Sequence, residues 1–136
     1  MNVNGVKWLD IPKILDERGN LSFIEKGADL KFDIKRVYWI YDVPGGEIRG
    51  GHAFKIQEEV IIALSGSFDV VLHDGLTSCR YSLNRSYKGL YISEMYWRHM
   101  ENFSTNAVCL VLASTLYSEE DYIYDFETFI KLAQGK

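Results

Sequence analysis

The chain has 136 residues, of which 47% are hydrophobic and 14% aromatic, and its formal net charge is −4 at pH 7. This length suits one domain, residues 1–136, and the scattered basic residues give no surface for nucleic acid. No apolar run approaches the ~20 residues of a membrane span, and the first five residues do not resemble a signal peptide. We therefore expect a cytoplasmic protein with no membrane or nucleic-acid partner.

Short apolar or alternating runs recur between turn signals along most of the chain, which is typical of β-strands. One such turn is Asp74-Gly75, a strong hairpin signal. The predicted strands cover residues 21–25, 34–41, 52–54, 59–64, 68–72, 79–83, 89–92, 96–100 and 107–113. Because no helical segment separates them, they predict a β-sandwich or barrel and not alternating β and α units.

The C-terminal end has a helical period. Ser118 is a suitable N-cap, and the acidic residues that follow it would lie in the first turn. Apolar residues then recur with helical spacing up to Gly135. They are Tyr122, Ile123, Phe126, Phe129, Ile130 and Ala133. We expect a helix from about Ser118 that lies against the barrel.

The two cysteines, Cys79 and Cys109, show no CxxC spacing. A disulfide framework or a zinc ribbon is therefore not expected. Both residues should be free thiols.

One segment follows the pattern G-x5-H-x-F-x4-E-x6-G, from Gly46 through His52, Phe54 and Glu59 to Gly66. It resembles the first signature of the cupin barrels, in which a second histidine stands at the position of Phe54. The resemblance implies an all-β cupin fold, that is, a double-stranded β-helix or jelly-roll barrel. In metal-binding cupins the two histidines and the glutamate hold a cation, and a phenyl ring cannot replace an imidazole ligand. We therefore expect neither a metal nor another cofactor.

Further motifs run through nearly the whole chain. They are Asp16-x-Arg18-Gly19-x-Leu21, Ile34-Lys35-Arg36-Val37-Tyr38, Arg49-Gly50-Gly51-His52-Ala53, Leu64-Ser65-Gly66-Ser67, Gly89-Leu90-Tyr91, Trp97, Phe103-Ser104, Leu112-Ala113-Ser114 and Glu120-Asp121-Tyr122-Ile123. Together they resemble the sugar 3,4-ketoisomerases of the FdtA, QdtA and WxcM-like cupins. The resemblance implies a homodimeric isomerase that acts on dTDP-4-keto-6-deoxyglucose. It also implies a place in the synthesis of deoxyamino sugars for lipopolysaccharide or S-layer glycans.

The chain departs from this family at two positions. The family motif R-G-x-H-A-H-K supplies two histidines, but here Phe54 stands at the second. The family motif W-H-E is here Trp97-Arg98-His99, so the histidine is displaced by one residue. On a strand, such a displacement turns a side chain to the opposite face.

Moving a carbonyl from C4 to C3 of a hexose requires a proton to leave C3 and a proton to arrive at C4. Histidine suits this chemistry because its ordinary pKa of ~6.5 lets it accept and donate protons near neutral pH. His52 is the predicted base or proton shuttle. His99, which shares a strand face with Trp97, is the second candidate for the cavity.

Five further residues are candidates for substrate binding. Arg36 or Arg49 could bind a diphosphate through charge-assisted hydrogen bonds. Tyr38 or Trp97 could stack on a base or a sugar. Without a metal, Glu59 needs another partner inside the barrel, either an arginine in a structural ion pair or a sugar hydroxyl.

Two other functions remain open at this point. The chain could be a catalytically silent cupin that binds a nucleotide sugar, and Phe54 favours this hypothesis. It could also be a nucleotide-sugar epimerase, since epimerisation likewise begins with proton removal beside a ketone.

Overall fold

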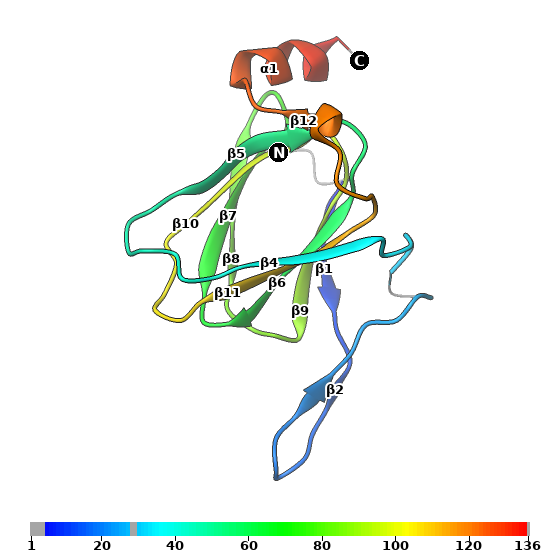
Figure 1. The fold of residues 1–136 in the computed structure, drawn as a ribbon, viewed down its shortest axis with the longest axis vertical. Coiled ribbons are helices and arrows are strands. Elements are labelled where there is room, and N and C mark those ends of the chain that lie inside the picture. Colours follow the sequence, from blue (N-terminus) through cyan, green and yellow to red (C-terminus); the bar gives the residue numbers. More distant parts are fainter. Residues whose placement is uncertain (1–4, 28–29, 136) are drawn as a thin grey trace.

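A computed structural model describes residues 5–27 and 30–135. Two five-stranded antiparallel sheets face each other, and a two-stranded hairpin lies outside them (Figure 1). One sheet has the order β1-β9-β6-β11-β4, and the other has the order β12-β5-β10-β7-β8. The strands are β1 (Val6–Asp10), β2 (Lys13–Ile14), β3 (Leu21–Ser22), β4 (Arg36–Ile40), β5 (Arg49–Phe54), β6 (Glu59–Ser65), β7 (Phe68–His73), β8 (Ser78–Leu83), β9 (Lys88–Ile92), β10 (Trp97–Glu101), β11 (Val108–Ala113) and β12 (Tyr122–Ile123).

The sheet order confirms the predicted cupin barrel. Neighbouring strands come from distant parts of the chain: β6 lies between β9 and β11, and β10 lies between β5 and β7. This is the arrangement of a double-stranded β-helix. The strands from β4 to β11 lie where the sequence predicts them, although β5 begins earlier, at Arg49.

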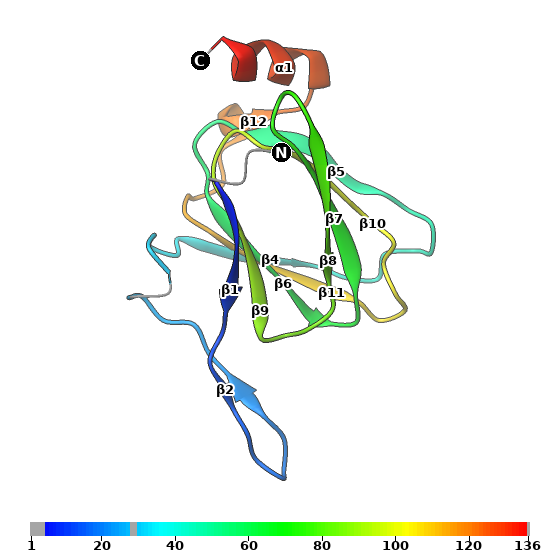
Figure 2. The same ribbon diagram turned by 180° about the vertical axis from the view of Figure 1, so that it is seen from behind.

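The β2–β3 hairpin projects from the barrel at the end opposite the C-terminal helix, as both views show (Figures 1 and 2). β3 has only two residues, whereas the sequence predicts a strand up to Glu25. Its one strand partner is β2, which is equally short. The strands β1, β2 and β12 were not predicted at all.

The core lies between the two sheets and follows from strand alternation. On β7, Phe68, Val70 and Leu72 are buried, while the residues between them are partly exposed. Successive side chains on a strand point to opposite faces, so this pattern places one face inside the barrel. A second apolar cluster covers the outer face of the first sheet. Its buried members are Ile11, Leu30, Phe32, Val60, Ile62 and Leu112.

The predicted start of the C-terminal helix at Ser118 is wrong. Residues Glu119–Asp121 form a single 3₁₀ turn, η1, and the Ser118 side chain makes no capping hydrogen bond. The next two residues, Tyr122 and Ile123, pair with β5 as the strand β12. Pairing with a sheet edge therefore overrides the helical period of this segment.

The helix α1 (Phe126–Gln134) begins after Asp125. The Asp125 carboxylate accepts a hydrogen bond from the Thr128 backbone N–H at 3.0 Å, which is the N-cap interaction that Ser118 lacks. Phe129 is fully buried and lies 5.9 Å from the Trp97 ring, measured between ring centroids. The helix thus packs against the outside of the barrel, as the sequence predicts.

Cys79 and Cys109 are both free, as predicted. Burial raises the pKa of the Cys109 thiol to about 12, so this side chain stays protonated. Within the described residues, no helix combines the length and the apolar character that crossing a membrane would require.

Candidate active site

His52 lies near the end of β5, directly before Ala53 and Phe54, which pair with β12. It pairs directly with Arg98 of β10, whose side chain is only 1% exposed. Because directly paired residues share one face of a sheet, both side chains point inward. The His52 ring lies 4.9 Å from the Phe54 ring and 5.2 Å from the Tyr122 ring, measured between centroids. The predicted base therefore stands among aromatic rings beside a buried cation.

Two glycines shape the strand just before His52. Gly50 and Gly51 have φ angles of 100° and 82°, which glycine adopts without strain. The register between β5 and β10 shifts at this point, so the strand carries a β-bulge. A Cβ atom on Gly50 would lie 3.0 Å from the Cα atom of His99, which leaves no room for a side chain. The bulge sets which residue of β5 stands opposite Arg98.

A buried ion pair joins the two sheets. The Arg98 guanidinium, on β10, forms a short ion pair with the Glu59 carboxylate, on β6. Glu59 Oε2 also accepts hydrogen bonds from the Tyr38 hydroxyl at 3.2 Å and from Gln57 Nε2 at 3.0 Å. The Nη2 atom of Arg98 is buried and has no hydrogen-bond partner among the described residues. It is therefore a donor that a ligand oxygen could satisfy.

Arg36, the first residue of β4, extends this polar network. Its Nη2 atom donates to Gln57 Oε1 at 2.9 Å, and the Thr115 hydroxyl donates to the same oxygen at 2.8 Å. The guanidinium carbon lies 5.1 Å from the centre of the Tyr38 ring and 5.6 Å from that of Tyr117. The Nη1 atom is buried and unpaired within the part of the chain that the structure describes. Arg36 thus offers a second buried donor, beside Tyr38 and Tyr117.

Burial and charge set the protonation states of these groups. Burial, assisted by the Arg98 charge, lowers the pKa of His52 to about 3, so the imidazole is neutral at pH 7. Burial lowers the pKa of Arg98 to about 10, which leaves the guanidinium charged at neutral pH. Burial also raises the pKa of Tyr38, so its phenol keeps its proton. The site therefore holds a neutral imidazole beside the fixed cation of Arg98.

These residues do not fit the metal of a metal-binding cupin. The Phe54 ring stands where a second imidazole would be needed, and the Arg98 guanidinium lies 5.0 Å from its centre. The same guanidinium pairs with Glu59, the third ligand position. No group of three or more histidine, cysteine or acidic residues suited to a metal occurs in residues 5–27 and 30–135.

The structure does not bring His99 and Trp97 to the cavity, so this part of the prediction is wrong. Both share one face of β10, as expected, but that face is the outer one, because Arg98 between them points inward. His99 Nε2 lies 2.7 Å from Glu101 Oε1, outside the barrel. The Trp97 ring packs against Phe126 of α1, with centroids 5.3 Å apart.

Arg49 is also separate from the site. It is exposed and pairs with Met100 at the opposite end of β5 from Phe54. The predicted residues that the structure does bring together are His52, Glu59, Arg36 and Tyr38.

Sequence reasoning missed Arg98 and Gln57. The available signal for Arg98 was the alternation of side chains along a strand. Trp97 and His99 lie on one face of β10, so Arg98 between them must point to the opposite face. Gln57 lies in the turn before β6 and carried no motif of its own. Its role as the link between Arg36 and Glu59 follows only from the three-dimensional contacts.

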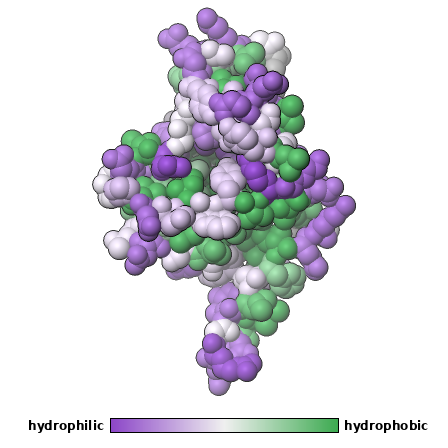
Figure 3. Space-filling model, viewed as in Figure 1, coloured by the Kyte–Doolittle hydropathy of each residue, from purple (hydrophilic) through white to green (hydrophobic). Residues whose placement is uncertain are grey.

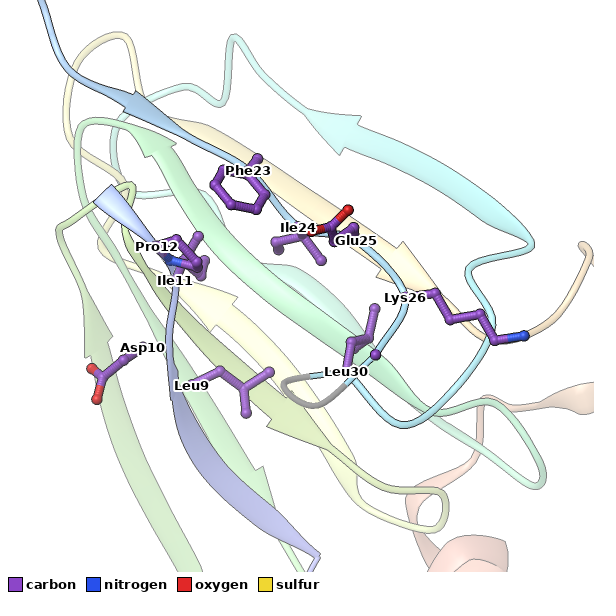
Figure 4. Close-up of a pocket in the computed structure, with 10 residues that line it drawn as sticks. Leu9, Asp10, Ile11, Pro12, Phe23, Ile24, Glu25, Lys26 and Leu30 are labelled. Atoms are coloured by element: carbon purple, nitrogen blue, oxygen red, sulfur yellow. The ribbon is translucent and has the colours of Figure 1, made fainter. Parts of the chain in front are cut away.

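A separate hollow of about 290 Å³ lies outside the barrel (Figure 4). Leu9 and Ile11 line one side of it, and Ile24 and Leu30 line the other. Lys26 and the other charged residues stand at its rim. It contains no acid–base pair comparable to the site around His52.

The family model of FdtA, described as WxcM-like, C-terminal, matches residues 4–134. The chain belongs to the FdtA family. This confirms the resemblance seen in the sequence motifs. A curated relative of this FdtA-family chain is a TDP-4-oxo-6-deoxy-α-D-glucose-3,4-oxoisomerase of Aneurinibacillus thermoaerophilus. It is 42% identical over 125 residues, which are 92% of this chain and 90% of the relative.

Solved structures agree. A 3,4-ketoisomerase from Helicobacter canadensis is 41% identical, with a TM-score of 0.92 over 95% of this chain and 97% of the other. The sugar 3,4-ketoisomerase QdtA from Thermoanaerobacterium thermosaccharolyticum, solved in complex with TDP, is 37% identical, with a TM-score of 0.96 over 98% of each chain. A histidine-to-asparagine mutant of QdtA has been solved in complex with TDP-4-keto-6-deoxyglucose.

Proposed function

We propose that this FdtA-family chain is a sugar 3,4-ketoisomerase that acts on a 4-keto-6-deoxyhexose linked to a nucleoside diphosphate, with dTDP as the nucleotide. The observation that carries the proposal is the neutral His52 imidazole facing the charged Arg98 inside the barrel. A base and a fixed cation are what an enolisation needs. Among the relatives named above, one is a TDP-4-oxo-6-deoxy-α-D-glucose-3,4-oxoisomerase and another is a sugar 3,4-ketoisomerase solved in complex with TDP.

The reaction is an internal proton transfer that needs no external oxidant or reductant. His52 takes the proton from C3, and the electron pair of that bond forms the C3–C4 double bond of an enediolate. The C4 carbonyl oxygen gains negative charge at this point. The enediolate then takes up one proton at C4 and one at O4 while O3 loses its proton, and the carbonyl stands at C3. Substrate and product are isomers, so atoms and electrons balance.

Arg98 is proposed to stabilise the enediolate. Its Nη2 atom is a buried donor without a partner among the described residues, and it belongs to a cation held in place by Glu59. A fixed donor aimed at developing negative charge lowers the barrier without reorganisation. The same negative charge would raise the pKa of His52 during the reaction, which helps the imidazole hold the proton.

Arg36 is proposed to bind the diphosphate of the substrate. Its guanidinium is held by Gln57, which in turn contacts Glu59, and its Nη1 atom has no hydrogen-bond partner among the described residues. A guanidinium matches the geometry of phosphate oxygens better than an ammonium does. Arg49, the other sequence candidate, is placed at the opposite end of β5 and is not assigned this role.

The test is incubation with dTDP-4-keto-6-deoxyglucose in deuterated water, followed by NMR of the sugar ring. We expect a 3-keto product that carries deuterium at C4. Exchange at C3 without a 3-keto product would indicate an enolising enzyme of another kind, such as an epimerase. If the substrate binds but neither C3 nor C4 exchanges, the chain is a silent binder, the alternative that Phe54 favours.

We also propose that two copies of the chain form a homodimer in the cytoplasm through the outer face of the first sheet. Val37, Trp39 and Leu64 are 46%, 57% and 52% exposed there, and Figure 3 shows apolar residues gathered on this side of the molecule. The projecting hairpin exposes Leu15 and Leu21 at 74% and 56%. An isolated two-stranded hairpin is marginally stable in water, so it needs a partner surface. A second copy would cover both apolar surfaces at once.

Light scattering after gel filtration tests this dimer. We expect a dimer mass at micromolar concentration and a shift towards the monomer for Trp39→Lys, because a charge in an apolar interface is costly to bury. Leu76→Lys is the matched control: Leu76 is 78% exposed in the turn between β7 and β8, away from this face, and its replacement should leave the mass unchanged. A wild-type chain of monomer mass would refute the proposal.

A further inference from the structure

Three successive backbone N–H groups in the turn between β5 and β6 converge on one residue, Asp121. The Ile56 N–H donates to Asp121 Oδ1 at 2.7 Å, and the Gln57 N–H donates to Asp121 Oδ2 at 3.1 Å. The Lys55 N–H donates to the backbone oxygen of Asp121 at 2.9 Å. Asp121 is only 7% exposed, and hydrogen bonds to an ionised carboxylate are stronger than neutral ones. Asp121 therefore fixes the backbone of this turn.

Asp121 is itself held by regular structure. It is the last residue of η1, and its backbone N–H donates to the Ser118 oxygen at 3.1 Å. The next residue, Tyr122, begins β12 and pairs with Phe54 of β5. The position of the carboxylate is thus set by the same strand that carries His52.

The side chain of Gln57 depends on the backbone of this turn. It is 1% exposed, and its amide contacts both charged parts of the site. Its Oε1 atom accepts hydrogen bonds from Arg36 at 2.9 Å and from the Thr115 hydroxyl at 2.8 Å, and its Nε2 atom donates to Glu59 at 3.0 Å. An amide has its acceptor on one side and its donors on the other, so only one orientation serves these partners. The backbone that Asp121 fixes determines whether the amide reaches them.

We propose that Asp121 is a positioning residue of the isomerase site and that it acts through Gln57. The inference rests on the proposed function, in which Arg36 binds the diphosphate and Arg98, paired with Glu59, stabilises the enediolate. The Asp121 carboxylate holds one amide in place, and that amide holds both Arg36 and the counterion of Arg98. Fixed donors lower a barrier only when they are aimed at the developing charge, so a displaced Gln57 reduces turnover as well as affinity.

Asp121→Asn keeps the size of the side chain but can accept from only one of the two side-chain-bound N–H groups, because its second terminal atom is a donor. We expect its turnover in the NMR assay to fall about 10-fold or more, since small misplacements at a site have large effects. Its TDP affinity, measured by calorimetric titration, should fall about 5-fold or more, because Arg36 is held less firmly.

Ser114→Ala is the matched control. The Ser114 hydroxyl accepts a hydrogen bond at 2.8 Å from the N–H of Glu58, the next residue of the same turn. Its loss therefore removes a side-chain acceptor from this backbone without releasing Gln57. Turnover and TDP affinity should stay within about 2-fold of wild type, and the melting temperature of each variant shows how far it is destabilised.

A double-mutant cycle separates positioning through Gln57 from a purely structural effect. Gln57→Met keeps the length of the side chain and removes its bonds to Arg36 and Glu59, so it should reduce turnover and TDP affinity at least as much as Asp121→Asn does. The double variant Asp121→Asn/Gln57→Met should be within about 2-fold of Gln57→Met, because residues that act as a unit are not additive. If Asp121→Asn does not fold, Asp121→Glu, which keeps the carboxylate but displaces it, replaces it in the cycle.

Three outcomes would overturn the inference. They are effects of Asp121→Asn and Gln57→Met that multiply in the double variant, wild-type turnover and TDP affinity in Asp121→Asn, and equal losses in Asp121→Asn and Ser114→Ala. Failure of the isomerase proposal gives a different result, because wild type would form no 3-keto product while TDP binding still showed the non-additive effect. If wild type forms the 3-keto product but the two effects multiply, the isomerase stands and Asp121 has a structural role only.

Discussion

Replacing His52 with asparagine is expected to reduce turnover by at least about 100-fold, the typical effect of losing a general acid–base group. The amide is similar in size to the imidazole but cannot accept a proton from carbon. Because Phe54 stands at the second histidine position of the family and cannot carry a proton either, no neighbouring imidazole on β5 can replace His52. Turnover is measured by the NMR assay, and TDP affinity and melting temperature should stay close to wild type.

His99→Asn is the matched control for this substitution. His99 lies on the outer face of β10 next to Glu101, so its loss should change turnover by less than about 3-fold. A second readout is the pH dependence of kcat/KM. Because the pKa of His52 is lowered to about 3, the free protein should keep its base form well below pH 6.5, the ordinary pKa of histidine. Near-full activity of His52→Asn, or loss of activity in His99→Asn, would show that the base is assigned wrongly.

The same pKa shift predicts how stability depends on pH. Between about pH 3 and 6.5 the unfolded chain protonates His52 while the folded chain does not. The unfolded state then binds more protons, so this group lowers the free energy of unfolding as the pH falls below 6.5. His52→Asn should therefore make unfolding less sensitive to pH in this range.

Glu59→Gln is expected to lower the free energy of unfolding by about 3 kcal/mol, because it leaves the Arg98 charge buried without a counterion. Both side chains are only 1% exposed, so water cannot screen the remaining charge. The measurement is urea denaturation followed by circular dichroism. For a chain of this size, such a loss would lower the melting temperature by about 10 °C.

The double variant Glu59→Gln/Arg98→Met separates the loss of a pair from the burial of an unpaired charge. It should recover much of the stability, since replacing a buried ion pair with neutral groups is often close to neutral. Asp10→Asn is the surface control. Asp10 pairs with Lys88 in solvent, and loss of that pair should cost less than about 1 kcal/mol. A Glu59→Gln protein as stable as wild type would mean that Arg98 does not depend on this carboxylate.

The barrel was predictable because most of its strands can be recognised from the residues of the strand itself and of the adjacent turns. β6 and β7 show short apolar or alternating runs bounded by turn residues, and this pattern suffices to place them. β12 was not predictable in this way. Its two residues lie within a helical period, and only the free edge of β5 gives them a partner. Local periodicity does not record which distant edge is available.

The candidate site was predictable where a motif fixed the strand face. The cupin pattern indicated His52 and Glu59 as residues of the barrel interior, and Arg36 and Tyr38, which are two residues apart, share one face of β4. On β10 the same alternation was read without knowing which face points inward. His99 was a candidate because it shares a face with Trp97, but Arg98 is the inward residue. Alternation along one strand shows which residues share a face and does not show which face packs inside the barrel.

Arg98 gives the barrel a cation that is covalently attached to the chain. A metal ion at the same place could dissociate, exchange for another metal or be removed by a chelator, whereas a guanidinium can do none of these. Its charge is lost only near its pKa of about 10, so it does not vary across the pH range of a cell. The positive charge opposite His52 is therefore present in every folded copy of the chain. It does not depend on the supply of a metal, and only a mutation of Arg98 removes it.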